Sequence, residues 1–122
     1  MFDEKFEPVK AVIIGEQRGD ISEISLDIST KTSQVTQYLG GPGTFIGQWP
    51  ELDIVIMKCR ESLFDPIINQ NKLAQPFTNE VVVGPILLIR MDSNAEPKDL
   101  HLTEIQESKL VLPRRPRRSA SQ

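Results

Sequence analysis

The sequence contains very few of the residues that form redox, metal and disulfide sites. Its 122 residues include one cysteine, Cys59, and one histidine, His101. A single thiol can close neither an internal disulfide nor a CxxC pair, which indicates a reducing compartment. Cys59 lies in an apolar run, which is typical of a small buried hydrophobic residue. His101 precedes an expected helix, where a capping or solvated role is typical. We predict no catalytic residue, no metal and no cofactor.

The sequence also lacks a long hydrophobic run. Its longest apolar stretch, residues 81–89, is interrupted by Gly84 and Pro85 and is too short to span a bilayer. The first ten residues, MFDEKFEPVK, contain acids where a secretory signal would be basic, and no apolar core follows them. We therefore expect an intracellular protein, cytoplasmic or nuclear, that makes no membrane contact.

Charge is unevenly distributed along the chain. The net charge is −3, yet residues 109–122 carry Lys109 and four arginines and no acid. Those five positive charges leave −8 for residues 1–108. The pattern indicates an acidic body followed by a basic tail. We divide the chain into a polar leader at residues 1–8, a domain at 9–110 and a disordered basic tail at 111–122.

Strand patterns occur in pairs. Residues 9–14 and 21–28 are joined by the turn EQRGD and predict one hairpin, and residues 44–49 and 52–60 predict a second. Residues 80–91 predict a long strand. Because proline cannot donate to a ladder, we expect this strand to bend or break at Gly84 and Pro85, at an edge or a bulge.

Two helices are expected between and after these strands. Residues 29–39 form a helical pattern, and Gly40 lies where a C-cap glycine belongs. Residues 102–110 form the second, with Thr103 and Gln106 at the spacing of a capping box. Paired strands with interspersed helices predict the α+β class: a single small domain with a mainly antiparallel sheet of about five to six strands and two short helices.

Residues 61–79 contain two prolines and three asparagines with scattered apolar residues. An excursion of this length is uncommon unless it is ordered for a purpose. We expect it to be an ordered contact surface, held by Phe64, Ile67, Leu73 and Phe77.

The segment YLGGPGTFIGQW, residues 38–49, combines four glycines with the only tyrosine and the only tryptophan. Its spacing, GxGxxxG, misses the dinucleotide fingerprint by one residue. It also has a helix before a strand, whereas phosphate-binding loops follow a strand. The first interpretation is a structural corner. The alternative is a groove for a small ligand or a peptide beside glycine backbone. The candidate lining residues are Tyr38, Gly41, Gly43, Phe45 and Trp49.

The segment RRPRRSAS places four guanidiniums within five residues and no aromatic side chain among them. Such a tail can follow a polyanion, an acidic protein surface or an import receptor. The alternative is a merely solubilising end. Phosphorylation of the two serines that follow would subtract local charge. The residues concerned are Arg114, Arg115, Arg117 and Arg118, with Ser119 and Ser121.

Short motifs over residues 9–108 resemble an uncharacterised small domain family of phages, bacterial mobile elements and large algal viruses, with relatives in algal genomes. Beyond the strands and the hairpin, they are a Gly-Gly helix end, an Asn-x-x-Ala motif, a Val-Gly-Pro strand and a Leu-Thr helix start. The resemblance implies a fold without implying an activity, and it adds Asn71 to the candidate binding residues. The matching positions are Gly40 and Gly41, Asn71 and Ala74, Val83 to Pro85, and Leu102 and Thr103.

Three functions stay open. The first is a non-catalytic interaction or accessory module that binds a protein or a small ligand. The second is a nucleic-acid-associated accessory protein that uses the arginine tail. The third is a small hydrolase or transferase, which requires a cleft that gathers at least two titratable side chains. A protein partner is expected. An unpaired strand edge near Gly84 and Pro85 would permit a homodimer.

Overall fold

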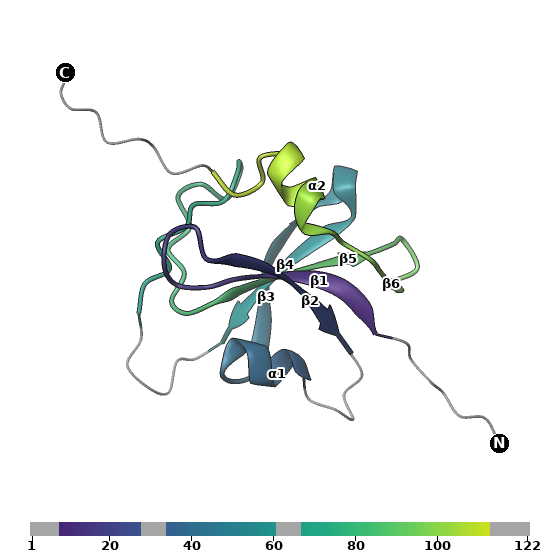
Figure 1. The fold of residues 1–122 in the computed structure, drawn as a ribbon, viewed down its shortest axis with the longest axis horizontal. Coiled ribbons are helices and arrows are strands. Elements are labelled where there is room, and N and C mark those ends of the chain that lie inside the picture. The colour runs from purple at the N-terminus through teal and green to yellow at the C-terminus, as the bar shows by residue number, and fades with distance from the viewer. Residues whose placement is uncertain (1–7, 28–33, 61–66, 113–122) are drawn as a thin grey trace.

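Across the residues that the structure describes, the protein is an α+β domain with two short α-helices and a mainly antiparallel sheet, as predicted (Figure 1). A computed structural model describes residues 8–27, 34–60 and 67–112. In chain order the elements are β1 (Val9–Ile14), β2 (Ile21–Leu26), α1 (Gln34–Leu39), β3 (Gly43–Trp49), η1 (Pro50–Leu52), β4 (Ile54–Cys59), β5 (Ile86–Met91), β6 (Pro97–Lys98) and α2 (Leu102–Glu107).

Two hairpins flank a central strand. The sheet order is β2-β1-β5-β4-β3, and the short strand β6 pairs with the end of β5. Both predicted hairpins are confirmed, because β1 pairs antiparallel with β2 and β3 pairs antiparallel with β4. β5 hydrogen-bonds to β1 on one side and to β4 on the other. Residues from the second half of the chain therefore join two hairpins from the first half.

The expected edge at Gly84 and Pro85 is wrong, although the expected break is present. Pro85 precedes the central strand, where its missing N–H interrupts no ladder. Gly84 makes the turn with a φ of +86°, a region that favours glycine. Val83 forms only an isolated bridge with Ile68. The strand edge on which the homodimer prediction depended is thus paired within the chain.

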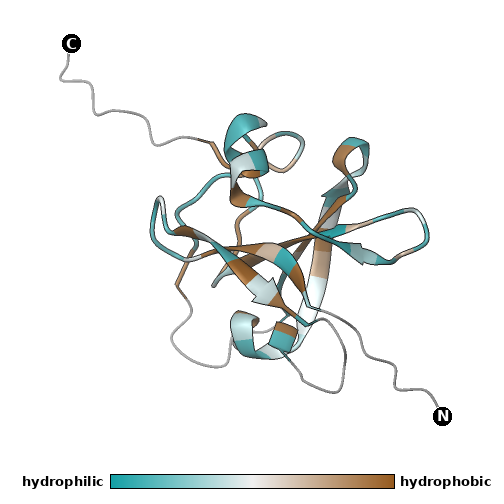
Figure 2. Cartoon of the chain, turned by 45° about the vertical axis from the view of Figure 1, so that its right-hand side comes forward, coloured by the Kyte–Doolittle hydropathy of each residue, from teal (hydrophilic) through white to brown (hydrophobic). Residues whose placement is uncertain are grey.

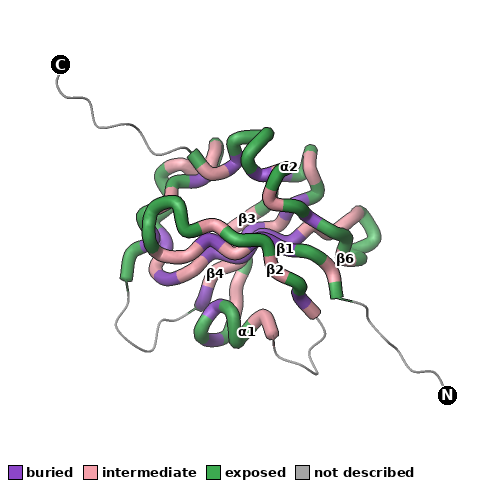
Figure 3. The backbone as a smooth tube through the Cα atoms, in the orientation of Figure 1, coloured by how far each residue is buried: buried purple, intermediate pink, exposed green. Residues whose placement is uncertain are grey.

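The sheet is covered on both faces, because side chains of the central strand alternate between two apolar clusters. The helices α1 and α2 lie on opposite sides of the sheet (Figures 1 and 3). Ile86 and Leu88 belong to the cluster on the α2 face, whereas Leu87 and Ile89 belong to the cluster on the α1 face. Hydrophobic residues accordingly concentrate in the central strands (Figure 2). The buried α2-face cluster comprises Val12, Ile14, Trp49, Ile54, Ile56, Leu73, Val82, Ile86, Leu88, Leu100, Ile105 and Leu110. The buried α1-face cluster comprises Ala11, Leu26, Leu39, Cys59, Leu87 and Ile89.

The ends of the first helix follow the sequence. Gly40 has a φ of +81°, and the N–H groups of Gly40 and Gly41 both donate to the carbonyl of Thr36. The predicted glycine C-cap is therefore present. The helix is described from Gln34 onward, and the earlier part of the predicted range, residues 29–33, lies outside the described residues.

The start and end of α2 differ from the prediction. The N-cap is His101, whose backbone N–H donates to the Glu104 carboxylate at 3.1 Å, so Thr103 and Gln106 do not form the capping box. The histidine ring is too large to be a preferred cap, which is why the spacing pattern missed it. The helix ends at Glu107, earlier than expected, because Lys109 takes a left-handed conformation and turns the chain.

The excursion is ordered across the part described, residues 67–79. Leu73 is buried, Phe77 packs against the α2-face cluster, and Ile67 is 49% exposed. Phe64 lies outside the described residues. Val111 forms a bridge with Leu73, so residues 111 and 112, which the sequence assigned to the tail, are instead held by the domain.

Candidate functional site

The structure separates the three aromatic residues that were predicted to line one groove. Trp49 is buried on the α2 face, where its Nε1 donates to the carbonyl of Gln75 at 3.0 Å and its ring meets Phe77 edge-on at 5.7 Å. Phe45 is 58% exposed. It lies opposite Met57 in the β3–β4 pair, and the Met57 side chain packs on the α1 face. Tyr38 lies on α1 and is 39% exposed. The sheet itself lies between Trp49 and the other two.

Of the two candidate glycines of this segment, Gly41 is buried and Gly43 is closely packed by side chains. Gly41 is buried and donates its N–H to the end of α1. At Gly43 an added Cβ would lie 3.0 Å from the tips of Leu39 and Met57. These positions fit the structural-corner interpretation, in which glycine permits close approach of backbone to side chains.

Asn71 holds the turn between β1 and β2. Its Nδ2 donates to the carbonyls of Gly15 and Gln17 at 3.0 and 2.9 Å, and its Oδ1 accepts from the N–H of Gly19 at 2.9 Å. Side-chain amides can replace a backbone ladder in this way wherever a loop has no strand partner. The candidate binding residue therefore uses its amide to fix the hairpin tip.

The side chain of Asn69 hydrogen-bonds to Asn71 and holds it in place. This side chain is the only buried polar one among the described residues, and its Nδ2 donates to the carbonyls of Gly84 at 2.8 Å and Ile14 at 3.3 Å. Its Oδ1 accepts from both the N–H and the Nδ2 of Asn71. The two amides thus join the excursion, the first hairpin and the turn before β5.

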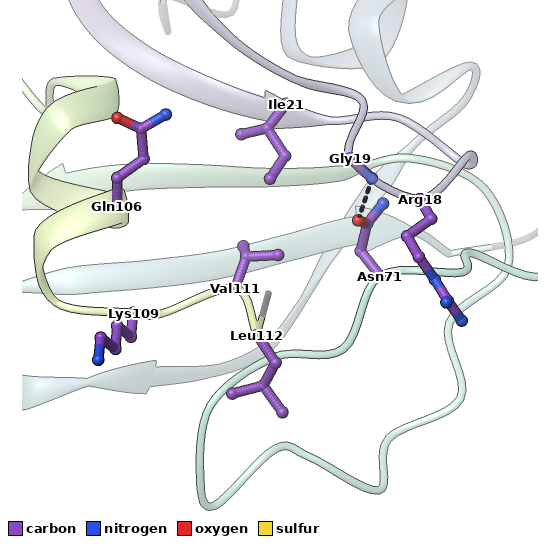
Figure 4. A pocket seen from close by; sticks show the side chains of 8 residues that line it. All are labelled: Arg18, Gly19, Ile21, Asn71, Gln106, Lys109, Val111 and Leu112. Carbon is purple, nitrogen blue, oxygen red and sulfur yellow. Dashed lines mark hydrogen bonds between the residues drawn. The ribbon is translucent and has the colours of Figure 1, made fainter. Parts of the chain in front are cut away.

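These contacts build one wall of a pocket, which we call the cationic pocket (Figure 4). Its volume is about 300 Å³. The β1–β2 turn, the start of β2, the excursion, α2 and the segment after α2 each contribute to it. Its lining residues are Arg18, Gly19, Ile21, Asn71, Gln106, Lys109, Val111 and Leu112.

The lining has an apolar centre and two cations. Arg18 and Lys109 lie on opposite sides of Val111 and Leu112 in Figure 4. Asn71 and Gln106 add amides, and no carboxylate, thiol, imidazole or hydroxyl side chain is among the lining residues. The pocket can therefore attract an anion and bury apolar surface, whereas its lining contains no carboxylate or imidazole to act as a general base.

The end of α2 explains how Lys109 reaches the pocket. Leu110 donates to the carbonyl of Ile105 and Lys109 donates to that of Gln106, which is the hydrogen-bond pattern of a Schellman motif. The position with a positive φ in this motif is usually glycine, and here Lys109 occupies it with a φ of 53°. Leu110 and Ile105 are both buried in the α2-face cluster, so the turn is fixed from inside.

A polar contact between β5 and α2 holds this helix on the sheet. Arg90 pairs with Glu104 at 2.8 Å and also donates to the carbonyls of Leu52 and Asp99. The hydrogen bond from Arg90 is the main reason that the pKa of the Glu104 carboxyl lies below its usual value, against the opposing effect of burial.

Glu23, on the edge strand β2, makes a further polar contact with the start of α2. Its Oε1 accepts from the N–H of Leu102 at 2.9 Å and lies 3.5 Å from Nδ1 of His101. His101 is thus at the start of α2, on the sheet face opposite the cluster that contains Cys59.

Sequence reasoning placed one residue of the pocket, Asn71, and missed the other lining residues. No local motif joins them, because they come from three stretches that are far apart in the chain: residues 18–21, Asn71 and residues 106–112. One signal was present in the sequence, because Arg18 lies in the short turn of a predicted hairpin. Lys109 gave none, because the second helix was expected to continue to residue 110. The predicted tail residues Arg114, Arg115, Arg117, Arg118, Ser119 and Ser121 lie outside the described residues.

Residues 8–27, 34–60 and 67–112 contain neither a metal-binding cluster nor a membrane-spanning helix. No group of three or more His, Cys, Asp or Glu side chains there is arranged to hold a metal ion. No helix within those ranges has the length and apolar character that crossing a bilayer requires.

Comparison with known proteins gives a family without an assigned activity. No curated protein and no solved structure matches the chain. The profile of a family of unknown function, DUF5880, matches residues 12–108. This range runs from β1 through α2 and includes the Asn69 and Asn71 clamp together with Arg18 and Gln106. Because the match covers most of the chain, the protein belongs to the family of unknown function DUF5880.

Proposed function

We propose that this protein is a non-catalytic interaction module that binds a protein partner inside the cell, with the cationic pocket as its contact site. The observation that carries the proposal is the composition of the pocket: an apolar centre, two cations and no acid. Binding requires only this complementarity, whereas catalysis requires convergent groups that transfer protons or attack a substrate.

The rigidity of the pocket wall supports the proposal. Asn71 and Asn69 fix the hairpin tip through side-chain hydrogen bonds, and the bridge between Leu73 and Val111 fixes the segment after α2. A preformed site loses little conformational entropy when a partner binds, which favours affinity. The loops around the pocket are therefore ordered before any partner arrives.

The hydrolase or transferase hypothesis receives less support from the same pocket. The pocket does gather two titratable side chains, but both Arg18 and Lys109 are cations. A hydrolytic site would add a base or a nucleophile that an anion-binding pocket does not need. A phage, mobile-element or algal-virus setting rests on the motif resemblance around Asn71 and Gly84.

Site-specific crosslinking tests the proposal. Benzoylphenylalanine in place of Gln106 puts a photoreactive group at the pocket, and the same substitution at Gln48, an exposed residue of β3, is the matched control. In cells that contain the protein, we expect a discrete crosslinked partner from position 106 that is absent when Arg18→Glu is added. Crosslinks that are the same at both positions, or that survive Arg18→Glu, would refute the proposal.

A second candidate function, nucleic-acid association, is favoured by one feature of the sequence. The chain continues from Leu112, a lining residue of the pocket, into four arginines within five residues. Comparing the full chain with residues 1–112 in titrations of DNA and RNA at low and moderate salt separates the candidates. Phosphate binding through the tail must weaken with truncation and with salt. Equal affinity of the two forms excludes this role.

A further inference from the structure

The chemistry of the cationic pocket specifies its ligand more closely than a general binding role. We propose that the pocket takes a short acidic segment of a protein partner that carries one aliphatic side chain. The aliphatic side chain lies on Ile21, Val111 and Leu112, and flanking carboxylates pair with Arg18 and Lys109. This inference rests on the proposed function, since it names the partner chemistry for the same site.

The apolar centre of the pocket requires an apolar group on the ligand. Leu112 is 37% exposed, and its backbone is held by a hydrogen bond to the carbonyl of Lys72. Val111 is fixed by its bridge to Leu73. A purely ionic ligand would leave this surface wet, whereas an aliphatic side chain would remove it from water. The volume of about 300 Å³ is at the lower limit for ligand pockets, so it fits one side chain with its backbone.

The charge around the pocket requires an anion, and a short one. The lining carries Arg18 and Lys109 and no acid, but residues 1–108 as a whole sum to −8. A long polyanion would extend over the rest of a body whose summed charge is negative, whereas a short acidic segment meets the two cations alone. No aromatic side chain lines the pocket, so base stacking has no platform. These features favour an acidic peptide over a nucleic acid.

The backbone of Lys109 supports a role in binding through a separate observation. A non-glycine residue in the left-handed region costs free energy, and such residues cluster at functional sites. Glycine would relieve this cost at the C-terminal position of α2, yet the chain has a lysine whose side chain lines the pocket. The same position therefore separates stability from binding in an experiment.

Fluorescence anisotropy with synthetic peptides on the full chain tests the proposal. The probe is a labelled peptide of Asp and Glu with one central Leu. The matched peptides replace the Leu with Ser, or replace the acids with Asn and Gln, and an oligothymidylate of equal charge serves as the nucleic-acid probe. We expect the Leu-containing acidic peptide to bind best, with about tenfold weaker binding after Leu is replaced by Ser.

Three variants locate the binding. Lys109→Gly and Arg18→Gln should each weaken binding of the acidic peptide by about threefold to fivefold, as expected for the loss of one exposed ion pair. Arg60→Gln, at an exposed arginine outside the pocket lining, should leave affinity unchanged. Lys109→Gly should also unfold at a temperature no lower than the parent, which excludes misfolding as the cause of weaker binding.

Several outcomes overturn the inference. These are equal binding of the Leu and Ser peptides, unchanged affinity of Lys109→Gly, or tighter binding of the oligothymidylate than of the acidic peptide. If a partner crosslinks at position 106 while no acidic peptide binds, the inference fails and the proposed function stands. If neither crosslinking nor peptide binding depends on Arg18, both fail.

Discussion

The two faces of the sheet differ in how much chain covers them. Among the described residues, twelve buried side chains form the α2-face cluster and six form the α1-face cluster. The α2 face also receives the excursion, the segment after α2 and the two clamping asparagines. The α1 face receives one six-residue helix. Within the described residues, the loops that pack on the sheet and the cationic pocket thus lie on the α2 face.

The largest expected effect compares neighbouring leucines of β5. Leu88 and Leu87 are both fully buried, but their side chains lie on opposite faces. Leu88→Ala should cost about 4 kcal/mol, because the surrounding loops cannot close the cavity, and Leu87→Ala about 2.5 kcal/mol, because a single short helix can shift inward. Urea denaturation of both variants measures the difference. Equal costs would mean that the two faces are equally rigid.

The next effect concerns the clamp that orders the excursion. Asn69→Ala removes both donors to Gly84 and Ile14 and the acceptor for Asn71, so we expect a loss of about 2 to 3 kcal/mol. Asn79→Ala, at an exposed asparagine of the same excursion, should change stability by less than about 0.5 kcal/mol. Thermal unfolding of the two variants and the parent protein measures both changes in stability. A small cost at Asn69 would show that water replaces the clamp.

Two glycines of β3, Gly43 and Gly47, allow a comparison of how closely side chains on the two faces approach the backbone. A Cβ on Gly47 would lie 2.6 Å from the ring of Phe77, whereas one on Gly43 would lie 3.0 Å from the flexible tips of Leu39 and Met57. We expect Gly47→Ala to destabilise by about 1 to 3 kcal/mol and Gly43→Ala by under about 1 kcal/mol. Denaturation midpoints of the two variants measure this. The reverse order would contradict the view that the α1 face adapts more easily.

The smallest effect is the pH dependence of the ion pair that holds α2. Because the pKa of Glu104 is lowered in the folded protein, its contribution is present above the ordinary glutamate value of 4.5 and is lost as pH falls through the folded pKa. Glu104→Gln should therefore be less stable than the parent at neutral pH, by under about 1 kcal/mol.

Measuring the stability of Glu104→Gln and of the parent protein over a range of pH tests this explanation. The stabilities of the variant and the parent should converge as the pH falls from 4.5 through the lower pKa of the folded protein, because the parent carboxyl becomes protonated there. A difference that is constant from neutral to acid pH would mean that the Arg90 pair contributes through packing alone.

Local patterns predicted the secondary structure better than the site. The alternation in 21–28, the Gly40 cap and the two hairpins could be read from the chain because each depends on neighbours in sequence. The central position of β5 could not, since its partners β1 and β4 are distant in sequence and the proline before it suggested an edge. The groove predicted from Tyr38, Phe45 and Trp49 assumed a shared face, which the sheet denies to Trp49.

The sequence by itself determined the α+β class, the paired strands, the glycine end of α1 and the acidic body with its basic end. These features follow from side-chain period, backbone conformation and composition, which act over a few residues or over the whole chain. Only the tertiary structure decided that Arg18, Asn71 and Lys109 surround one apolar hollow. Long-range hydrogen bonds and burial bring those residues together, and neither leaves a pattern in adjacent letters.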